Sequence, residues 1–149
     1  MKQNSVLVSG AAGALGQKIL RAYLDKGESV VALDTKPCPD NFSDYSDRFV
    51  WIEQDLSHPS GMNIVLKQLK ATVSVRLLVN TIGLIHNEPC ISFDSGQLVP
   101  HSAETWEQVI SANLTAPFFL SSGVASLMMR SGGGSIINMS SVSAQGIAG

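Results

Sequence analysis

The sequence predicts an α/β fold in which helices cover both faces of a doubly wound parallel sheet. Short apolar runs recur along the chain without polar residues alternating inside them, which is typical of strands buried on both faces. Stretches with apolar residues three and four positions apart lie between these runs and indicate helices. Strands and helices that alternate along a chain form a parallel sheet with right-handed crossovers. We expect the 149 residues to belong to a single domain.

The expected elements follow one another without an internal repeat. Strands are expected at residues 5–9, 30–33, 49–52, 77–79 and 136–140. Helices are expected from residue 15 to about 26, over 62–69 and from 103 to about 129, with loops at 36–47 and 86–101. Gly27 stands where a glycine commonly ends a helix, and Ser102 is the expected N-cap of the third helix. In sheets of this kind, ligands bind at the carboxyl ends of the strands.

Composition and charge disfavour several classes of function. The net charge is −2, and no cluster of lysine and arginine offers a surface for nucleic acid. The N-terminal apolar run is too short for a signal peptide, and we expect no membrane span. Cys38 and Cys90 have neither metal-ligand spacing nor the pattern of a disulfide framework, and the three histidines show no metal spacing. We therefore expect a cytoplasmic protein with free thiols and without a bound metal.

Three glycines stand three residues apart directly after the first expected strand, in the stretch VSGAAGALGQ at residues 8–17. Between a strand and a helix, such glycines allow a tight turn, the approach of a pyrophosphate to the backbone and close packing of the helix on the strand. The helix N-terminus then presents unpaired N–H groups to the phosphates. Gly10, Gly13 and Gly16 therefore predict a dinucleotide site, with a flexible linker or an ordinary tight turn as the alternative interpretation.

Asp34 follows the second expected strand, 24 residues after Gly10. A carboxylate at this place can accept hydrogen bonds from both ribose hydroxyls of an adenosine, and it would repel a 2′-phosphate. NAD is therefore the expected cofactor, in preference to NADP. Lys36 could offset part of this preference by reaching a 2′-phosphate, and Asp34 could instead serve as a helix cap or a turn residue.

The glycine stretch resembles the glycine motif of the short-chain dehydrogenases/reductases, a family with a Rossmann-like fold. Residues 9–16, SGAAGALG, match the variant with glycines three apart, whereas the commoner form has glycine where Ala14 stands. Asp55 and Leu56 resemble the acidic and apolar pair with which the family holds adenine. Residues 80–83, NTIG, stand where the family has Asn-Asn-Ala-Gly, so only the first and last residues of that motif match.

Two further matches lie later in the chain and keep the order of the family. Residues 106–114 resemble the long fourth helix with its catalytic asparagine, here Asn113. Residues 137–142, INMSSV, resemble the strand that delivers the catalytic serine, here Ser141. The resemblance implies that the nicotinamide cofactor is held by Gly10, Gly13, Leu15, Gly16, Asp34, Asp55, Leu56, Asn80 and Gly83.

Asn113 and Ser141 are the candidate catalytic residues. Pro117 follows Asn113 by one helical turn and has no N–H, so a helix through both leaves the Asn113 carbonyl without its usual donor. In the family, the equivalent carbonyl holds a water in a proton relay. The resemblance also implies that Ser141 donates to the substrate carbonyl as hydride arrives. A simple helix kink near Asn113, and turn serines at residues 140–141, are the alternative interpretations.

The proton donor of the family does not occur in the 149 residues. The family uses a tyrosine downstream of the serine, with a lysine one helical turn beyond it that lowers the pKa of the phenol. Tyr23 and Tyr45 have Gly27 and Phe49 at that spacing, so the chain has no Tyr-x-x-x-Lys. We therefore expect residues 1–149 to be a C-terminally truncated dinucleotide-binding domain that is inactive as given.

Three functions are open on these grounds. The first is an NAD(P)-dependent oxidoreductase that transfers hydride between the cofactor and a small-molecule alcohol/carbonyl pair, with a homo-oligomer expected for the full-length form. The second is a non-catalytic NAD-binding module. The third is a flavodoxin-like or receiver-like domain, which is disfavoured because the first loop lacks the paired acids of a receiver. In a chain cut at Gly149, the fifth strand would form a sheet edge with open apolar surface, which favours association.

Overall fold

The computed structural model describes residues 3–142. Its main sheet has five parallel strands in the order β3-β2-β1-β4-β7. The strands are β1 (Gln3–Ser9), β2 (Ser29–Asp34), β3 (Phe49–Glu53), β4 (Val73–Asn80) and β7 (Ser135–Asn138). All five expected strands are confirmed, although β4 begins earlier than residue 77 and β7 ends before residue 140.

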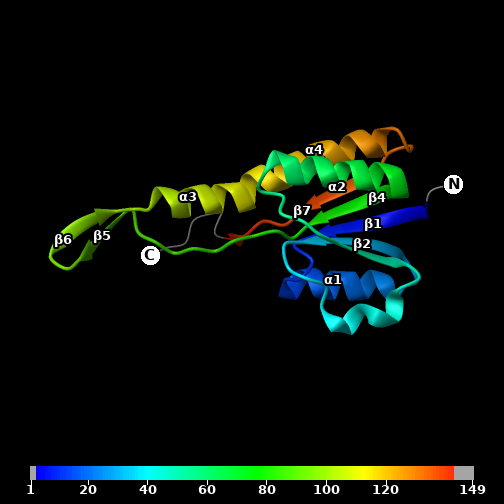
Figure 1. The fold of residues 1–149 in the computed structure, drawn as a ribbon, viewed down its shortest axis with the longest axis horizontal. Helices are drawn as coiled ribbons and strands as arrows, with labels where there is room; N and C mark the ends of the chain where they lie inside the picture. The colour runs from blue at the N-terminus through cyan, green and yellow to red at the C-terminus, as the bar shows by residue number, and fades with distance from the viewer. Residues whose placement is uncertain (1–2, 143–149) are drawn as a thin grey trace.

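Helices cover both faces of this sheet (Figure 1). α1 (Ala14–Leu24) lies on one face, where Leu20 and Leu24 are fully buried among side chains of β1 and β2. α2 (Pro59–Thr72) and α4 (Ala116–Met129) lie together on the other face and enclose a second apolar cluster. Because each central strand is covered on both sides, it is apolar throughout, as the doubly wound α/β fold requires. This fold class is confirmed.

The carboxyl ends of the strands meet at one edge of the sheet. Ser9 at the end of β1 pairs with Leu33 of β2 on one side and with Asn80 of β4 on the other. Asn80 pairs in turn with Asn138 at the end of β7, and Asp34 follows Leu33 directly. The expected binding edge therefore brings together the ends of four strands.

The expected loop at residues 36–47 is in part helical. It contains a short 3-10 helix, η1 (Asp40–Tyr45). Phe42 in this helix is 1% exposed and packs with the apolar cluster on the α1 face. Because Phe42 lies among polar residues, its burial in the core cannot be predicted from the pattern of apolar residues in the sequence.

The expected loop at residues 86–101 is wrong in a similar way, because it contains a hairpin. β5 (Ile91–Asp94) and β6 (Gln97–Pro100) pair antiparallel as a separate two-stranded sheet. Ser95 and Gly96 between them have φ angles of 50° and 85°. Two successive positive φ values are the mark of the tight turn that suits a two-residue hairpin. Figure 1 shows this hairpin at the end of the molecule that is remote from the sheet.

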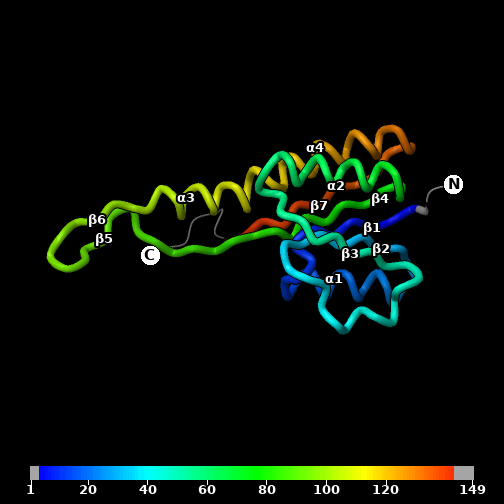
Figure 2. The backbone as a smooth tube through the Cα atoms, viewed as in Figure 1, coloured from blue at the N-terminus to red at the C-terminus, as the bar shows by residue number. Residues whose placement is uncertain are grey.

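The expected helix from residue 103 to 129 is present, but it is not a regular α-helix. α3 (Ala103–Ile110) leads into a π-helical segment, η2 (Ser111–Thr115), and then into α4, so that one continuous rod results (Figure 2). The N–H that follows η2 donates to the carbonyl five residues before it. Pro117 has no N–H for the Asn113 carbonyl, and a widened turn next to the proline accommodates this loss.

The same rod has the length and apolar composition of a membrane-spanning helix, contrary to our expectation. It comprises 27 residues, and 17% of its most apolar window is buried. Within α4, however, a stripe with four-residue spacing packs against the sheet and is buried, namely Ala116, Leu120, Val124 and Met128. A stripe of this kind is typical of a helix that covers the core of a globular domain.

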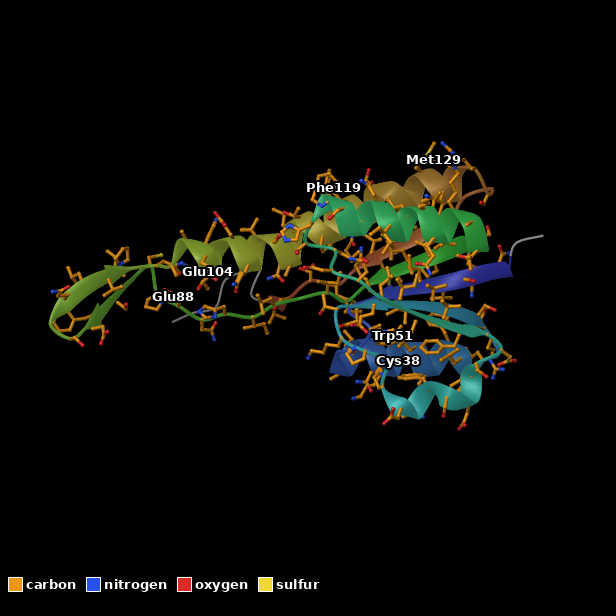
Figure 3. All side chains as sticks on the ribbon, viewed as in Figure 1. Cys38, Trp51, Glu88, Glu104, Phe119 and Met129 are labelled. Carbon is orange, nitrogen blue, oxygen red and sulfur yellow. The ribbon has the colours of Figure 1, made fainter. Side chains whose placement is uncertain are left out.

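β7 is an edge strand of the described sheet, as expected. Apolar side chains near it are open to solvent, with Ile137 45% exposed and Met139 48% exposed. Phe119 and Met129 on the outer side of α4 are also exposed, and Figure 3 labels both. That this open surface drives association stays a prediction.

Candidate cofactor-binding site

A cleft of about 360 Å³ opens at the carboxyl edge of the sheet. Its lining includes six of the residues expected to bind the cofactor, namely Gly10, Gly13, Asp34, Asp55, Leu56 and Gly83. Lys36 and Thr81 line the cleft beside them, and Ala112 and Ala116 close it from the helical rod. Three expected residues, Leu15, Gly16 and Asn80, are not part of the lining. The structure thus gathers most of the expected cofactor residues around one space.

The glycine loop needs bare backbone at two of its positions. Gly10 has a φ angle of +71°, and a Cβ atom there would lie 2.7 Å from the backbone nitrogen of Ile82. Gly16 is buried, and a Cβ atom there would lie 2.3 Å from the Gly10 carbonyl oxygen. The first glycine therefore fits a tight turn against the segment that follows β4, and the last one lets α1 pack on the loop. Leu15 beside it is 45% exposed at the start of α1.

The N-terminus of α1 follows the glycine loop directly, and the first N–H groups of the helix have no partner within it. Gly13 is the N-cap, and no side chain caps the helix there. The first turn of α1 carries no acidic side chain. The N-terminal N–H groups and the helix dipole therefore favour an anion, and no carboxylate of that turn competes for them. This is the arrangement that a pyrophosphate needs.

Asp34 is held in place by backbone N–H groups from three segments. Its Oδ2 accepts a hydrogen bond of 2.8 Å from the Ala12 N–H, and its Oδ1 accepts one of 3.0 Å from the Lys36 N–H. The Gln54 N–H donates to the Asp34 carbonyl oxygen at 2.8 Å. A carboxylate oxygen has more than one lone pair, so each oxygen can still accept from a ribose hydroxyl. The carboxylate is thus fixed at the wall of the cleft.

Asp55 and Leu56 lie beyond the end of β3. Asp55 makes polar contacts, whereas Leu56 is buried among apolar side chains. Hydrogen bonds from Ser57, by its hydroxyl and by its N–H at 2.8 Å, lower the pKa of the Asp55 carboxyl below its ordinary value. Leu56 is 7% exposed and packs into the apolar cluster on the α2 face. The Asp55 carboxylate is therefore an anionic acceptor at the cleft, and the buried Leu56 side chain anchors the backbone next to it.

Asn80 is buried beneath the cleft and joins three elements. Its Oδ1 accepts from the Ser9 hydroxyl at 2.7 Å. Its Nδ2 donates to Ser121 Oγ at 3.0 Å and to Asn138 Oδ1 at 2.7 Å. β1, α4 and β7 are thereby tied to the end of β4. In the structure, Asn80 braces the strand ends that carry the cleft.

Asn113 binds the segment that follows β4. Its Oδ1 accepts from the Leu84 N–H at 2.7 Å, and its Nδ2 donates to the Leu84 carbonyl at 2.8 Å. Leu84 and Gly83 both line the cleft, although Asn113 does not. The asparagine side chain therefore reaches across from the π segment and fixes one wall of the site. A proton relay through its backbone carbonyl stays a prediction.

Ser141 lies after the end of β7 and is exposed to solvent. The backbone before it still follows the sheet, since the Met139 N–H donates to the Asn80 carbonyl at 3.1 Å. Ser141 is not among the residues that line the cleft. Within residues 3–142, no group of three His, Cys, Asp or Glu side chains is arranged to hold a metal ion.

Thr81 is a site residue that the sequence reading did not assign. Its hydroxyl donates to the Ser9 carbonyl at 2.7 Å and lies 3.2 Å from the Gly10 carbonyl. Thr81 stands at the second position of the degraded NTIG motif, where the family has asparagine. The hydroxyl ties β4 to the start of the glycine loop, a contact that a mismatch to a motif does not reveal.

Comparison with known proteins places these features in a family. The family model for short chain dehydrogenase matches residues 4–148. The chain is 29% identical over 147 residues to the short chain dehydrogenase ausX of Aspergillus calidoustus, covering 97% of this chain and 54% of that protein. It is 31% identical over 151 residues to the uncharacterized oxidoreductase YxjF of Bacillus subtilis, covering 95% of this chain and 54% of that protein. The chain thus spans about half the length of these relatives.

Solved structures agree with this assignment. A short chain dehydrogenase from Leptospira borgpetersenii with bound NAD⁺ matches with a TM-score of 0.82 and 26% identity, covering 100% of this chain and 56% of that one. A 4-hydroxyisoleucine dehydrogenase complexed with NADH matches with a TM-score of 0.80 and 28% identity, covering 97% of this chain and 59% of that one. The structure of ElxO with NADP bound shares the fold, with a TM-score of 0.80 at 21% identity.

The comparisons also exclude one of the three functions that the sequence leaves open. A flavodoxin-like or receiver-like domain is excluded, because the family model covers nearly the whole chain. The strand order β3-β2-β1-β4-β7 and the glycine loop beside the cleft fit the same assignment. This chain belongs to the short-chain dehydrogenase/reductase family.

Proposed function

We propose that this protein binds NAD(H) in the cleft and takes part in hydride transfer between that cofactor and a small-molecule alcohol/carbonyl pair. The observation that carries the proposal is the Asp34 carboxylate, which lines the cleft and is fixed by the Ala12 and Lys36 amides. A fixed carboxylate next to a glycine loop suits the diol of an adenosine ribose. It repels the 2′-phosphate of NADP, so NAD is the preferred cofactor.

The residues of the cleft fit the other parts of the dinucleotide. The uncapped N-terminus of α1 offers donors to the pyrophosphate, and Asp55 offers an acceptor to the amino group of adenine. Gly83 leaves open space, since the nearest atom to a Cβ there would be Asn113 Oδ1 at 3.9 Å. When bound, the nicotinamide supplies the hydride donor or acceptor.

We assign Asn113 and Ser141 to the chemical step. The Ser141 hydroxyl would donate to the substrate oxygen and stabilise the charge that develops on it. The Asn113 carbonyl, deprived of its helical donor by Pro117, would hold a water that relays protons. Because the 149 residues contain no Tyr-x-x-x-Lys, we expect the chain by itself to bind NAD(H) without turning over an alcohol or a ketone.

Replacement of Asp34 tests the proposal. We expect Asp34→Ala to raise the dissociation constant for NAD⁺ at least tenfold, as the loss of hydrogen bonds to a charged group implies, and to leave binding of NADP⁺ unchanged or tighter. Isothermal titration calorimetry of the chain with each nucleotide measures both constants.

Asp34→Asn is the matched control, because it keeps the size of the side chain and removes the charge. We expect it to weaken NAD⁺ binding less than Asp34→Ala and to strengthen NADP⁺ binding, since the repulsion of the 2′-phosphate is gone. An equal loss of both nucleotides in Asp34→Ala would contradict the role of Asp34. No binding of either nucleotide by the unaltered chain would contradict the proposed function.

A further inference from the structure

Trp51 is connected to the cleft by a series of hydrogen bonds although it does not line it. Its indole N–H donates to the Lys36 carbonyl at 3.1 Å. The Lys36 N–H donates to Asp34 Oδ1 at 3.0 Å, and Asp34 Oδ2 accepts from the Ala12 N–H at 2.8 Å. We name this series, Trp51 to Lys36 to Asp34 to Ala12, the β3–loop chain. It runs from β3 through the turn after β2 to the glycine loop.

The position of Trp51 is itself well supported. It pairs with Ala32 across the β2–β3 ladder. Its ring is half-buried and packs edge-on against Phe49, with ring centroids 6.2 Å apart. Figure 3 labels Trp51 on the α1 side of the sheet, where its ring packs against the apolar cluster of that face. The indole therefore offers its N–H to the turn after β2 from a rigid strand.

The turn after β2 holds the groups that a 2′-phosphate would seek. Lys36 lines the cleft with Asp34, and its ammonium group has four rotatable bonds with which to reach an anion. Backbone N–H groups of such a turn also bind phosphates. In this structure, the Lys36 N–H is directed at Asp34 instead, and the Lys36 carbonyl, which belongs to the next peptide group, accepts from Trp51.

From this geometry we infer that Trp51 is a positioning residue for nucleotide discrimination. By fixing the Lys36 carbonyl, it keeps the Lys36 N–H on Asp34 and so keeps the Asp34 carboxylate turned toward the ribose diol. Without the indole donor, the turn gains freedom, Asp34 loses orientation, and Lys36 can move to a 2′-phosphate. The inference rests on the proposed binding of NAD(H) and extends it to a residue outside the cleft.

Trp51→Phe tests the inference, because it keeps an aromatic ring and removes the N–H. The Lys36 carbonyl bond is exposed, so water can replace the indole and the thermal midpoint should change little. We expect the dissociation constant for NAD⁺ to rise about three- to tenfold, the range for one lost hydrogen bond, while that for NADP⁺ stays level or falls. Calorimetric titration with each nucleotide gives the ratio of the two constants, which a general loosening would not change.

Phe49→Leu is the matched control on the same strand. Phe49 packs against Trp51 and Phe42 but belongs to no hydrogen bond of the β3–loop chain. We expect it to lower the thermal midpoint and to leave the ratio of the two constants unchanged. An unchanged ratio in Trp51→Phe, or an equal shift of the ratio in Phe49→Leu, would overturn the inference while leaving the proposed function intact. An unaltered chain that binds neither nucleotide overturns both.

Discussion

For the single residue Asn80, the sequence predicts that it matters but not what its side chain does. Its motif position implied contact with the cofactor, whereas the side chain is 2% exposed and makes three hydrogen bonds within the protein. All three partners, Ser9, Ser121 and Asn138, are distant in sequence. The pairing of β4 with β1 and β7 and the packing of α4 bring them together. The motif identifies the residue, and the structure shows that its amide group links β1, α4 and β7 by hydrogen bonds.

Asp34 was more predictable, because its role depends on local order along the chain. It stands at the end of the second strand, and an apolar run makes that strand evident in the sequence. The hydrogen bonds from Ala12 and Lys36 were not predictable, since they depend on the backbone course of two turns. Ser141 lies between these cases, because the strand before it was expected but its distance from the cleft could not be read from the sequence.

Gly10→Ala should destabilise the fold by more than the strain of a positive φ angle alone, because the added Cβ atom would also clash with neighbouring backbone. The φ angle of +71° makes an L side chain unfavourable by about 1–2 kcal/mol, and the Cβ atom would lie within 2.8 Å of the Thr81 backbone as well. We expect the free energy of unfolding to fall by about 3 kcal/mol or more, as measured by urea denaturation.

Gly27→Ala separates the two causes. Gly27 has a φ angle of +79°, but nothing lies within 4 Å of a Cβ there. Its replacement should cost only the backbone strain, about 1–2 kcal/mol. Equal losses for the two variants would mean that the close approach of the glycine loop to β4 is not present in solution.

At the scale of secondary-structure elements, the strands and helices of the sheet were predictable and the hairpin was not. Apolar runs and helical spacing identify the segments that are buried on both sides or on one side. β5 and β6 bury almost nothing, so the alternation that marks a half-buried strand is absent. The Ser95-Gly96 pair is nevertheless a turn signal, although it lies within a polar stretch without a clear strand on either side.

Glu88 links the segment after β4 to the start of α3 and makes that link dependent on pH. Its carboxylate accepts from the Ser102 N–H at 3.0 Å, and Ser102 caps α3 by accepting from the Thr105 N–H at 3.2 Å. The bond from Ser102 is the main cause that lowers the pKa of Glu88 below the ordinary value of 4.5. His101 and His86 approach the same carboxylate at 3.8 and 3.3 Å.

The sign of the effect follows from that lowered pKa. The contact stabilises the fold fully above the unfolded pKa, and the stabilisation is lost as the pH falls through the lower pKa of the folded state. We expect the amide proton shift of Ser102, followed by NMR, to titrate with a midpoint below 4.5. Glu88→Gln should abolish this titration, whereas Glu104→Gln in the first turn of α3 should leave it in place; a midpoint at or above 4.5 would contradict the assignment.

At the scale of the whole molecule, the structure separates a binding edge from an open edge. The cleft, the glycine loop and the α1 N-terminus lie at the carboxyl ends of the central strands. β7 and the outer side of α4 expose apolar side chains over the described residues, including Phe118 at 63% and Met129 at 82%. The family relation accounts for the first edge. The chain spans about half the length of the relatives it matches.

Mapping the binding of NAD⁺ onto the assigned amide spectrum of the chain tests most directly whether this cleft binds NAD(H). We expect the largest shift changes at Gly10, Ala12, Gly13, Lys36 and Gly83, with the signals of Asp94 and Gly96 in the hairpin unchanged. NADP⁺ should need a higher concentration to produce the same changes. Shifts confined to the hairpin or to the outer side of α4, or no shifts at millimolar NAD⁺, would contradict binding in this cleft.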